Sequence, residues 1–337
     1  MPGDRRACDD DPLRAHGADA VGALSLLVTG AAGYVGRATV EEARARGHRV
    51  VALVRRDRGV GFGEGVETRV ADLVDGDLDA ALRGVDVVIH CAASLAGSDA
   101  EMRRDTVVAT ERLMRALARS EARRMVLVGS MAVYGASELA PGSRVDEDTP
   151  LETRFAERDA YCRAKLAQEE VAAREAVEAG RELWILRAGA VWGPGRLDHG
   201  HLGVGLGPLL LRLGAEGEIP LVHRDHCAEA LVRAAETPTE GPVEIVNVLD
   251  DERPDRLRYL AARGDSGPIL PLSWRLFDRL AGLRFPRAPG LLRRPVLRAR
   301  MMPLEYTNRR LHERLGWRPR HGFEEAMAAA KMDPAQR

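Results

Sequence analysis

Short apolar runs alternate with amphipathic stretches along residues 23–192 of the chain. The apolar runs have the length and the β-branched content of buried strands. They cover residues 24–28, 49–54, 67–70, 85–90, 124–128 and 183–187. Between several of them, stretches such as 100–120 and 160–179 repeat apolar residues at helical spacing. Strands that alternate with helices form a mainly parallel sheet with helices on both faces, so we predict an α/β fold with a doubly wound parallel sheet.

The residue composition changes on either side of this region. Residues 1–22 mix charge, glycine and proline without an apolar centre, which predicts a flexible tail rather than a secretory signal. After residue 193 glycine and proline become frequent and the strand signals weaken, residues 241–248 being the clearest that remain. We therefore predict a sheet domain over residues 23–192 and a smaller C-terminal lobe over residues 193–337. We expect that lobe to be interleaved with late strands and helices of the sheet domain.

Composition excludes several classes of protein. Lys plus Arg number 50 and Asp plus Glu number 51, so the formal net charge of -1 gives no field that would draw the chain to nucleic acid. A run of about 18 apolar residues is absent from the sequence, which argues against a transmembrane segment. The sequence has four cysteines, Cys8, Cys91, Cys162 and Cys227. They have neither the spacing of a zinc site nor the density of a disulfide scaffold. We therefore expect no bound metal and a reducing, cytoplasmic setting.

Three glycines spaced three residues apart mark the boundary between the first apolar run and the first helical pattern, in the stretch "TGAAGYVG" at residues 29–36. A glycine-rich turn lets the backbone approach a pyrophosphate, and the helix that follows offers unpaired N–H groups and a favourable dipole. We expect Gly30 to make the turn, Gly33 to admit the phosphates and Gly36 to let the helix pack closely, with Tyr34 and Val35 beside them. Such turns also use glycine for steric reasons alone, so the alternating context is what favours a dinucleotide here.

Further motifs follow the glycine turn in a recognisable order. They are "ADL" at residues 71–73, "HCAA" at 90–93, "GSMAVYG" at 129–135, "YCRAK" at 161–165, "RAGAVWGPG" at 187–195, "LVHRDHCAEAL" at 221–231 and "LGWRPRHGFEEAM" at 315–327. In these motifs the chain resembles an extended short-chain dehydrogenase/reductase of the NAD-dependent epimerase/dehydratase family. The resemblance implies a Rossmann-type sheet that binds a nicotinamide dinucleotide, together with a C-terminal lobe that binds the substrate.

The resemblance also implies a catalytic set of Ser130, Tyr161 and Lys165. Tyr161 and Lys165 are four residues apart in a helical pattern, so both side chains leave one helix face. A phenol has a reference pKa near 10, and we expect the ammonium and an oxidised nicotinamide ring to favour phenolate. In the family Tyr161 would exchange a proton with the substrate, Ser130 would hydrogen-bond the same oxygen and Lys165 would hold the nicotinamide ribose. Without the other motifs, this spacing would indicate an ordinary amphipathic helix.

The coenzyme-binding residues carried over from the family extend beyond the glycine turn. They are Asp72, Leu73, Ala92, Ala93, Ala188 and Val191, together with Tyr161 and Lys165. The end of the second strand usually carries an acidic residue that binds the adenosine ribose. Val54 stands there in this chain, and Arg55 and Arg56 follow it. Guanidinium groups pair with a 2'-phosphate, so we predict NADP(H) as the preferred coenzyme and keep NAD(H) open, because Asp57 would also reach the ribose.

Three positions depart from the family pattern. Thr106 stands where the family often has Asn, so the route by which protons reach the catalytic residues would differ from that of the family. Ala188 replaces a proline near the nicotinamide, which removes a rigid turn. Trp192 replaces a tyrosine. We predict that Trp192, Met131 and Ala132 contact the substrate.

Several reactions remain open, because one scaffold serves reductases, epimerases and dehydratases. Sugar dehydratases of the family place an Asp-Glu pair directly after the catalytic hydroxyl residue, where this chain has Met131 and Ala132. Our first hypothesis is hydride transfer between nicotinamide and a secondary alcohol or ketone. The alternatives are a nucleotide-sugar epimerase with tightly bound NAD, and a dinucleotide-binding sensor or scaffold without turnover.

An arginine-rich segment, residues 284–300, follows an apolar stripe at residues 272–283. Its arginines are Arg284, Arg287, Arg293, Arg294, Arg298 and Arg300. Diphosphate recognition, contact with an anionic membrane surface and a solvated charged face all fit the segment. The stripe, with Leu276, Leu280 and Leu283, predicts core packing or a lid over an apolar small-molecule substrate. Family resemblance further implies a homodimer through the helices at 100–120 and 160–179.

Overall fold

The main sheet of the computed structural model consists of seven strands that all pair in parallel. The model describes residues 22–332 except 58, 60, 265–266, 283–289 and 291–292, so residues 1–21 of the predicted tail lie outside it. The strands are β1 (Ser25–Thr29), β2 (Arg49–Val54), β3 (Val66–Val70), β4 (Val87–His90), β5 (Arg124–Ser130), β7 (Glu182–Ala188) and β12 (Val243–Val248). Their order is β12-β7-β5-β4-β1-β2-β3, which confirms the predicted α/β fold with a doubly wound parallel sheet.

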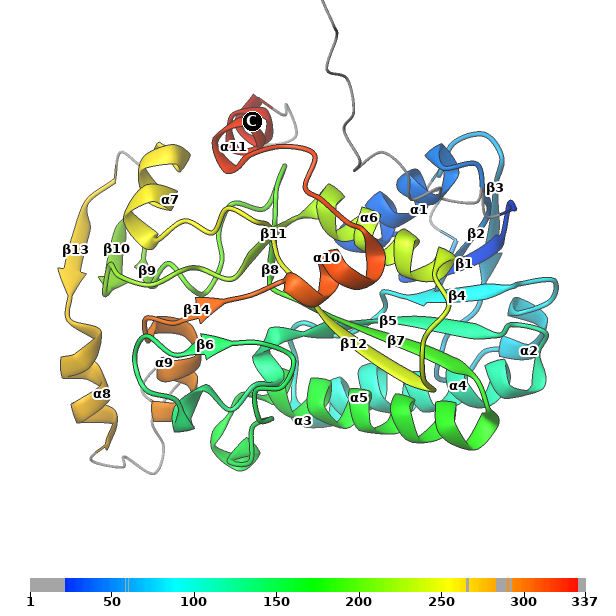
Figure 1. Cartoon of the computed structure of the whole chain (residues 1–337), viewed down its shortest axis with the longest axis horizontal. Helices are drawn as coiled ribbons and strands as arrows, with labels where there is room; N and C mark the ends of the chain where they lie inside the picture. The colour runs from blue at the N-terminus through cyan, green and yellow to red at the C-terminus, as the bar shows by residue number, and fades with distance from the viewer. Residues whose placement is uncertain are drawn as a thin grey trace, which may run out of the picture.

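Helices cover both faces of this sheet (Figure 1). On one face lie α1 (Tyr34–Ala45) and α6 (Arg224–Glu236), and on the other lie α2 (Leu78–Ala81), α3 (Asp99–Met102), α4 (Ala109–Arg119) and α5 (Ala160–Ala179). A π-helical turn, Arg103–Val108, joins α3 to α4, so the helix expected at 100–120 forms in three consecutive pieces.

Strand β1 shows why the central strands of the sheet are almost continuously apolar. Leu26 and Val28 belong to the core under α1 and α6, whereas Leu27 belongs to the core under α4 and α5. All three side chains are fully buried. Because a central parallel strand has no solvent face, it needs apolar residues on both sides.

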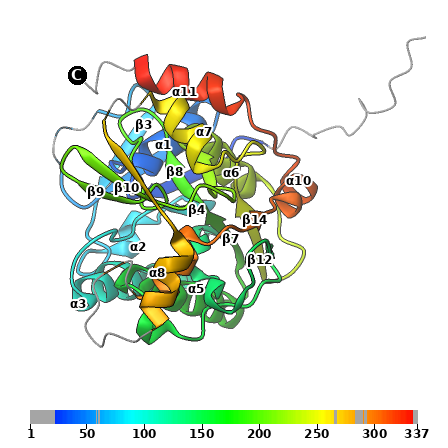
Figure 2. The same ribbon diagram turned by 90° about the vertical axis from the view of Figure 1, so that its left-hand side faces the viewer.

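Smaller elements extend the fold beyond the carboxyl ends of β5 and β7. Short strands form three further sheets: β8 (Ala190–Trp192) with β11 (Leu221–His223), β6 (Arg144–Val145) with β14 (Glu305–Tyr306), and β9 (Val204–Leu206), β10 (Leu209–Leu213) and β13 (Ile269–Leu272) together. The helices of this part are α7 (Arg256–Arg263), α8 (Trp274–Gly282), α9 (Arg294–Met301), α10 (Arg309–Leu315) and α11 (Phe323–Met332). Figure 2 shows β9, β10, β13 and α8 at this end of the molecule. From this part of the chain, α6 packs on the main sheet and β12 joins it.

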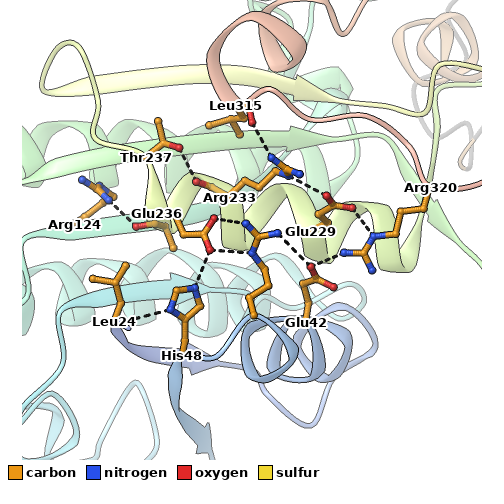
Figure 3. Close-up of polar contacts among 12 residues, drawn as sticks. Leu24, Glu42, His48, Arg124, Glu229, Arg233, Glu236, Thr237, Leu315 and Arg320 are labelled. Atoms are coloured by element: carbon orange, nitrogen blue, oxygen red, sulfur yellow. Dashed lines mark hydrogen bonds and ion pairs between the residues drawn. The ribbon is translucent and has the colours of Figure 1, made fainter. Parts of the chain in front are cut away.

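Ion pairs fasten α1 to α6 and to the segment before α11 (Figure 3). Glu236 accepts hydrogen bonds from the Arg46 guanidinium at 2.6 Å and from His48 Nε2 at 2.9 Å. The Leu24 backbone N–H donates to His48 Nδ1, which leaves Nε2 as the donor toward Glu236. Arg320 pairs with Glu42 of α1 at 2.6 Å. These contacts hold both helices on the face of the sheet that lies behind the glycine turn.

We predict that Glu236→Gln lowers the free energy of unfolding by about 1–2 kcal/mol near neutral pH. Burial raises the pKa of Glu236, but hydrogen bonds from Arg46 and His48 outweigh it and the net shift is downward. The stabilisation is therefore complete above the ordinary carboxyl pKa and is lost as the pH falls through the lowered folded-state value. Urea unfolding of both proteins at about pH 7 and about pH 4 measures the difference.

Glu67→Gln is the matched control, because Glu67 pairs with Arg49 and Arg69 on the surface of the molecule. We expect it to cost less than about 0.5 kcal/mol. Equal losses for the two variants, or a Glu236→Gln loss that stays constant at acid pH, would contradict this account.

Candidate active site

The glycine turn lies at the point where the strand order of the main sheet reverses, between β1 and β4. Gly30 has a φ of +63°, and a Cβ on it would lie 2.9 Å from the Ala92 Cα. A Cβ on Gly36 would lie 2.2 Å from the Gly30 carbonyl oxygen. Gly33 is the N-cap of α1. The helix start therefore rests directly on the turn, where its N–H groups fit a phosphate.

Two cavities meet at this turn and share Gly30, Gly33 and Ala93 in their walls. The first has a volume of about 520 Å³ and contains the three predicted catalytic residues. Its other predicted lining residues are Tyr34, Val35, Gly36, Met131, Ala132, Ala188 and Val191. The second cavity, of about 550 Å³, is lined by Arg55, Arg56, Asp72, Leu73 and Ala92. The fold thus brings together the predicted site residues, with one exception.

Trp192 is that exception, and its prediction as a substrate contact is wrong. Its side chain is 1% exposed and packs against His223, Tyr259 and Phe323, with ring centroids 5.2 to 6.1 Å apart. Val191 lines the cavity, whereas the Trp192 side chain enters the core of the C-terminal part.

Ser130 and Tyr161 meet where β5 ends and α5 begins. Asp159 caps α5 by accepting from the Cys162 N–H at 2.9 Å, which fixes the turn that carries Tyr161. Burial raises the pKa of Tyr161, and a hydrogen bond with Ser130 lowers it by less. The protein groups by themselves therefore favour the neutral phenol of Tyr161.

Lys165 lies one turn further along α5 and is buried. Its ammonium donates to the Val128 carbonyl and to Gln168 Oε1, both at 2.8 Å. Burial lowers the pKa of Lys165 to about 8, against an opposing effect of Glu169. Since an ammonium has three N–H donors, one remains for the cavity that Lys165 lines.

A buried ion pair lies behind these residues, and the sequence analysis did not identify it. Glu169 of α5 accepts from Arg187 of β7 at 2.9 Å. The Arg187 guanidinium lies over the Tyr134 ring, 4.9 Å from its centroid, and Tyr134 donates to Asn247 Oδ1 of β12 at 2.6 Å. The pair therefore ties α5 to the sheet on the side of Ser130, whose backbone also contacts Glu169.

The second cavity has basic groups at the end of β2. Arg55 and Arg56 are exposed and form part of its wall. Asp57 accepts from the Gly59 N–H at 2.9 Å and is not part of that wall. Asp72, further along the wall, accepts from the Val74 N–H at 2.7 Å. The site thus has Val54 where a ribose-binding carboxylate would stand, and two guanidinium groups directly after it.

The far wall of the first cavity comes from the C-terminal part of the chain. These residues include Ala299, Arg300, Leu304 and Tyr306, and of these only Arg300 was singled out from the sequence. Arg300 donates to Asp159 at 2.9 Å, so its charge is neutralised by the residue that caps α5.

The other described arginines of residues 284–300 also have internal partners. Arg294 and Arg298 both donate to Asp278 of α8, at 2.9 and 2.8 Å. Arg293 donates to the Arg158 carbonyl at 3.5 Å. Arg284 and Arg287 lie outside the described residues.

Helix α8 differs from the expected apolar stripe. Leu276 and Leu280 are 54% and 42% exposed, whereas Trp274, Asp278 and Ala281 face the core. The ion pairs of Asp278 explain which face of α8 is buried. Its carboxylate pairs with two arginines of α9, so the face that carries Asp278 packs against α9. The prediction of a buried stripe or lid is therefore wrong for Leu276 and Leu280, and Leu283 lies outside the described residues.

Thr106, at the position where the family often has Asn, lies in the π-helical turn. It is buried, and its hydroxyl oxygen accepts from the Ser94 N–H at 3.1 Å. Neither cavity includes it in its wall. Thr106 thus anchors the segment after β4.

Within the part of the chain that the structure describes, no group of three or more His, Cys, Asp or Glu side chains could hold a metal ion. Of the described helices, none combines the length and apolar character needed to cross a membrane. The cysteines among these residues, Cys91, Cys162 and Cys227, are free.

Comparison with known proteins agrees with the geometry. Cinnamoyl-CoA reductase 1 from Petunia hybrida is 30% identical over 182 residues, which cover 50% of this chain and 55% of that protein. The chain therefore spans about half the length of this relative. A 3-diazoavenalumate denitrifying reductase from a Streptomyces species is 30% identical over 322 residues, or 88% of this chain and 97% of the relative.

Solved structures share the fold. MoeE5 in complex with UDP-glucuronic acid and NAD has a TM-score of 0.69 and 24% identity, and the match covers 90% of this chain and 97% of that chain. Residues 26–248 match the model of the NAD dependent epimerase/dehydratase family. The predicted membership is confirmed: this chain belongs to the NAD-dependent epimerase/dehydratase family of extended short-chain dehydrogenases/reductases.

Proposed function

We propose that this chain is an NADP(H)-dependent oxidoreductase that reduces the carbonyl group of a largely apolar ketone and catalyses the reverse oxidation of the alcohol. The observation that carries the proposal is the first cavity, in whose wall Ser130, Tyr161 and Lys165 lie beside the glycine turn. The close contacts of Gly30 and Gly36 form a cradle with room for a pyrophosphate and for no further side chain.

Ser130, Tyr161 and Lys165 have different roles in the proposed reduction. A bound nicotinamide supplies the hydride that the carbonyl carbon accepts. Tyr161, held as a phenol by burial, gives its proton to the carbonyl oxygen, so that C=O becomes CH–OH. Ser130 donates a hydrogen bond to the same oxygen. Lys165 binds the nicotinamide ribose through its remaining N–H, and its positive charge stabilises the phenolate left on Tyr161 until solvent returns the proton.

The cavity wall supports a ketone with an apolar body. A sugar dehydratase of the family needs two carboxylates directly after the catalytic hydroxyl residue. This chain has Met131 and Ala132 directly after Ser130 instead. Met131, Ala136, Val145 and Leu304 add apolar surface. A nucleotide sugar needs cations for its diphosphate, and Arg300, which α9 contributes to this wall, is already paired with Asp159. Arg196 also lines the cavity, where its guanidinium lies over the Tyr34 ring.

Two described relatives bear the names of reductases, which supports this choice over an epimerase. The solved neighbour with a bound nucleotide sugar shares only the fold. Denaturing extraction of the purified protein separates the hypotheses, because a reductase releases and rebinds its coenzyme whereas an epimerase retains NAD through the reaction. We expect no stoichiometric NAD in the extract; a full equivalent would support the epimerase.

We predict that Tyr161→Phe lowers kcat/KM for ketone reduction at least about 100-fold, because the variant lacks the proton donor. The dissociation constant for NADPH should stay within about threefold of wild type, since the phenol contacts the substrate oxygen. A ketone panel followed by NADPH absorbance gives the first quantity and fluorescence titration the second. Turnover equal to wild type would remove Tyr161 from the chemistry.

Replacement of Arg55 and Arg56 by Ser should weaken NADPH binding about tenfold and change NADH binding little, because the lost guanidinium groups face the 2'-phosphate alone. Arg123→Ser is the matched control, an exposed arginine beside the amino end of β5, at the opposite edge of the sheet from the cavities. Titration of wild type and of both variants with NADPH and with NADH gives the ratio of the two dissociation constants for each protein. Equal weakening for NADPH and NADH would overturn the NADP(H) preference.

We also propose a homodimer in the cytoplasm. The helices that the resemblance assigns to the interface, α4 and α5, lie side by side on the outer face of the sheet (Figure 1). A solution mass of twice the 36.7 kDa chain by light scattering supports the dimer, and a single-chain mass contradicts it.

A further inference from the structure

A continuous chain of buried hydrogen bonds begins at Lys165 and ends at Thr29, the last residue of β1. Lys165 donates to Gln168 Oε1 at 2.8 Å, and Gln168 Nε2 donates to the Thr110 hydroxyl at 2.9 Å. The Thr110 hydroxyl also lies 2.9 Å from His90 Nε2. His90 Nδ1 lies 2.7 Å from the Thr29 hydroxyl, at the end of β1. All five side chains are at most 3% exposed.

The direction of every bond in this chain follows from one contact. The Thr110 hydroxyl donates to the Thr106 carbonyl at 2.6 Å, so it accepts from both Gln168 and His90. His90 therefore carries its proton on Nε2 and accepts from the Thr29 hydroxyl on Nδ1. Burial lowers the pKa of His90 to about 3, which keeps the imidazole neutral. Because Thr110 requires the NH₂ group of Gln168, the amide oxygen has to face Lys165.

We propose that Gln168 is a positioning residue for Lys165: its amide, oriented by Thr110 and His90, holds the ammonium in place and directs its free N–H toward the cavity. The inference rests on the role proposed above for Lys165. An amide oxygen accepts from the ammonium without taking up its proton, so the contact holds Lys165 without opening a proton path into the core. Gln168 lies outside every motif on which the family resemblance depends.

The charged and titratable groups around Lys165 come from three elements. Burial lowers the pKa of Lys165, and the opposing effects of Glu169 of α5 and Cys91 after β4 are smaller. Glu169 is itself paired with Arg187 of β7. His90 of β4 is neutral. Gln168 acts with Glu169 in stabilising the charged amine, so removal of the Gln168 oxygen should favour the uncharged form.

The sequence offers a direct measurement, because Lys165 and Lys331 are its two lysines. Protein grown with lysine labelled with ¹³C at Cε gives two NMR signals, and Lys331→Arg assigns them. Lys331 is exposed and serves as an internal reference. A pH titration then reports the pKa of Lys165 in the full-length protein, with no need for substrate or coenzyme.

We expect Gln168→Met, which keeps the side-chain length and removes both polar atoms, to lower the pKa of Lys165 by about one to two units. The Lys331 signal should titrate as in wild type. A Lys165 pKa within about 0.3 units of wild type in this variant would overturn the proposal.

A second pair of variants tests how the amide is oriented. Thr110→Val removes the hydroxyl at nearly constant volume, and Thr110→Ser retains it. We expect a lower Lys165 pKa in Thr110→Val and a value close to wild type in Thr110→Ser. Equal values in the two variants would overturn the assignment of the amide orientation to Thr110. This pair also keeps the test decisive if Gln168→Met does not fold.

Activity separates this inference from the proposed function. If wild-type protein reduces ketones, the apparent pKa of the pH–rate profile should move downward with that of Lys165 in Gln168→Met. If wild-type protein reduces no ketone in the panel, the reductase proposal fails, while the NMR titration still decides whether Gln168 holds the Lys165 ammonium.

Discussion

The burial of one ammonium group is the constraint on which the rest of this site depends. Lys165 has lost its hydration, so each acceptor around it comes from the fold: the Val128 carbonyl of β5, Gln168 on its own helix and the field of Glu169. These partners require α5 to pack in one register against β5 and β7. The same register brings Tyr161 next to Ser130 in the wall of the cavity.

A second constraint is the contact between α1 and the turn that precedes it. With Gly36 against the Gly30 carbonyl, the start of α1 reaches the point where the strand order reverses, and two cavities open on either side. One cavity leads toward Arg55 and the other toward Tyr161. A dinucleotide that spans the turn would thus place its adenosine end and its nicotinamide end in different chemical surroundings.

Local patterns in the sequence predicted those parts of the molecule that depend on local physics. All six expected strand segments lie in the main sheet. Five of them are largely buried on both faces and therefore leave apolar runs, whereas β3 is a partly exposed edge strand. The glycine turn and the spacing of Tyr161 and Lys165 could also be recognised in the sequence. Close backbone contacts require glycine at the turn, and helix geometry places residues four apart on one face. The site residues on either side of the turn came together because parallel strands present their carboxyl ends at one edge.

Features set by distant partners could not be predicted in this way. Asp278 determines which face of α8 is buried, and its partners Arg294 and Arg298 come from another helix. The burial of Trp192 depends on three rings from other segments. Gln168 looked like an ordinary polar residue of an amphipathic helix, and only the positions of Thr110 and His90 give it a defined orientation. The paired state of Arg300 likewise required the position of Asp159.

In the proposed reaction, Tyr161 and a nicotinamide together convert a ketone into an alcohol that leaves the enzyme. Reduction with NADPH that carries deuterium on the transferred position of C4 tests this reaction, with the product examined by mass spectrometry and NMR. We predict one deuterium on the carbinol carbon of the released product and stoichiometric NADP⁺. Deuterium that stays with the coenzyme, or substrate recovered with only its configuration changed, would contradict the proposed reduction.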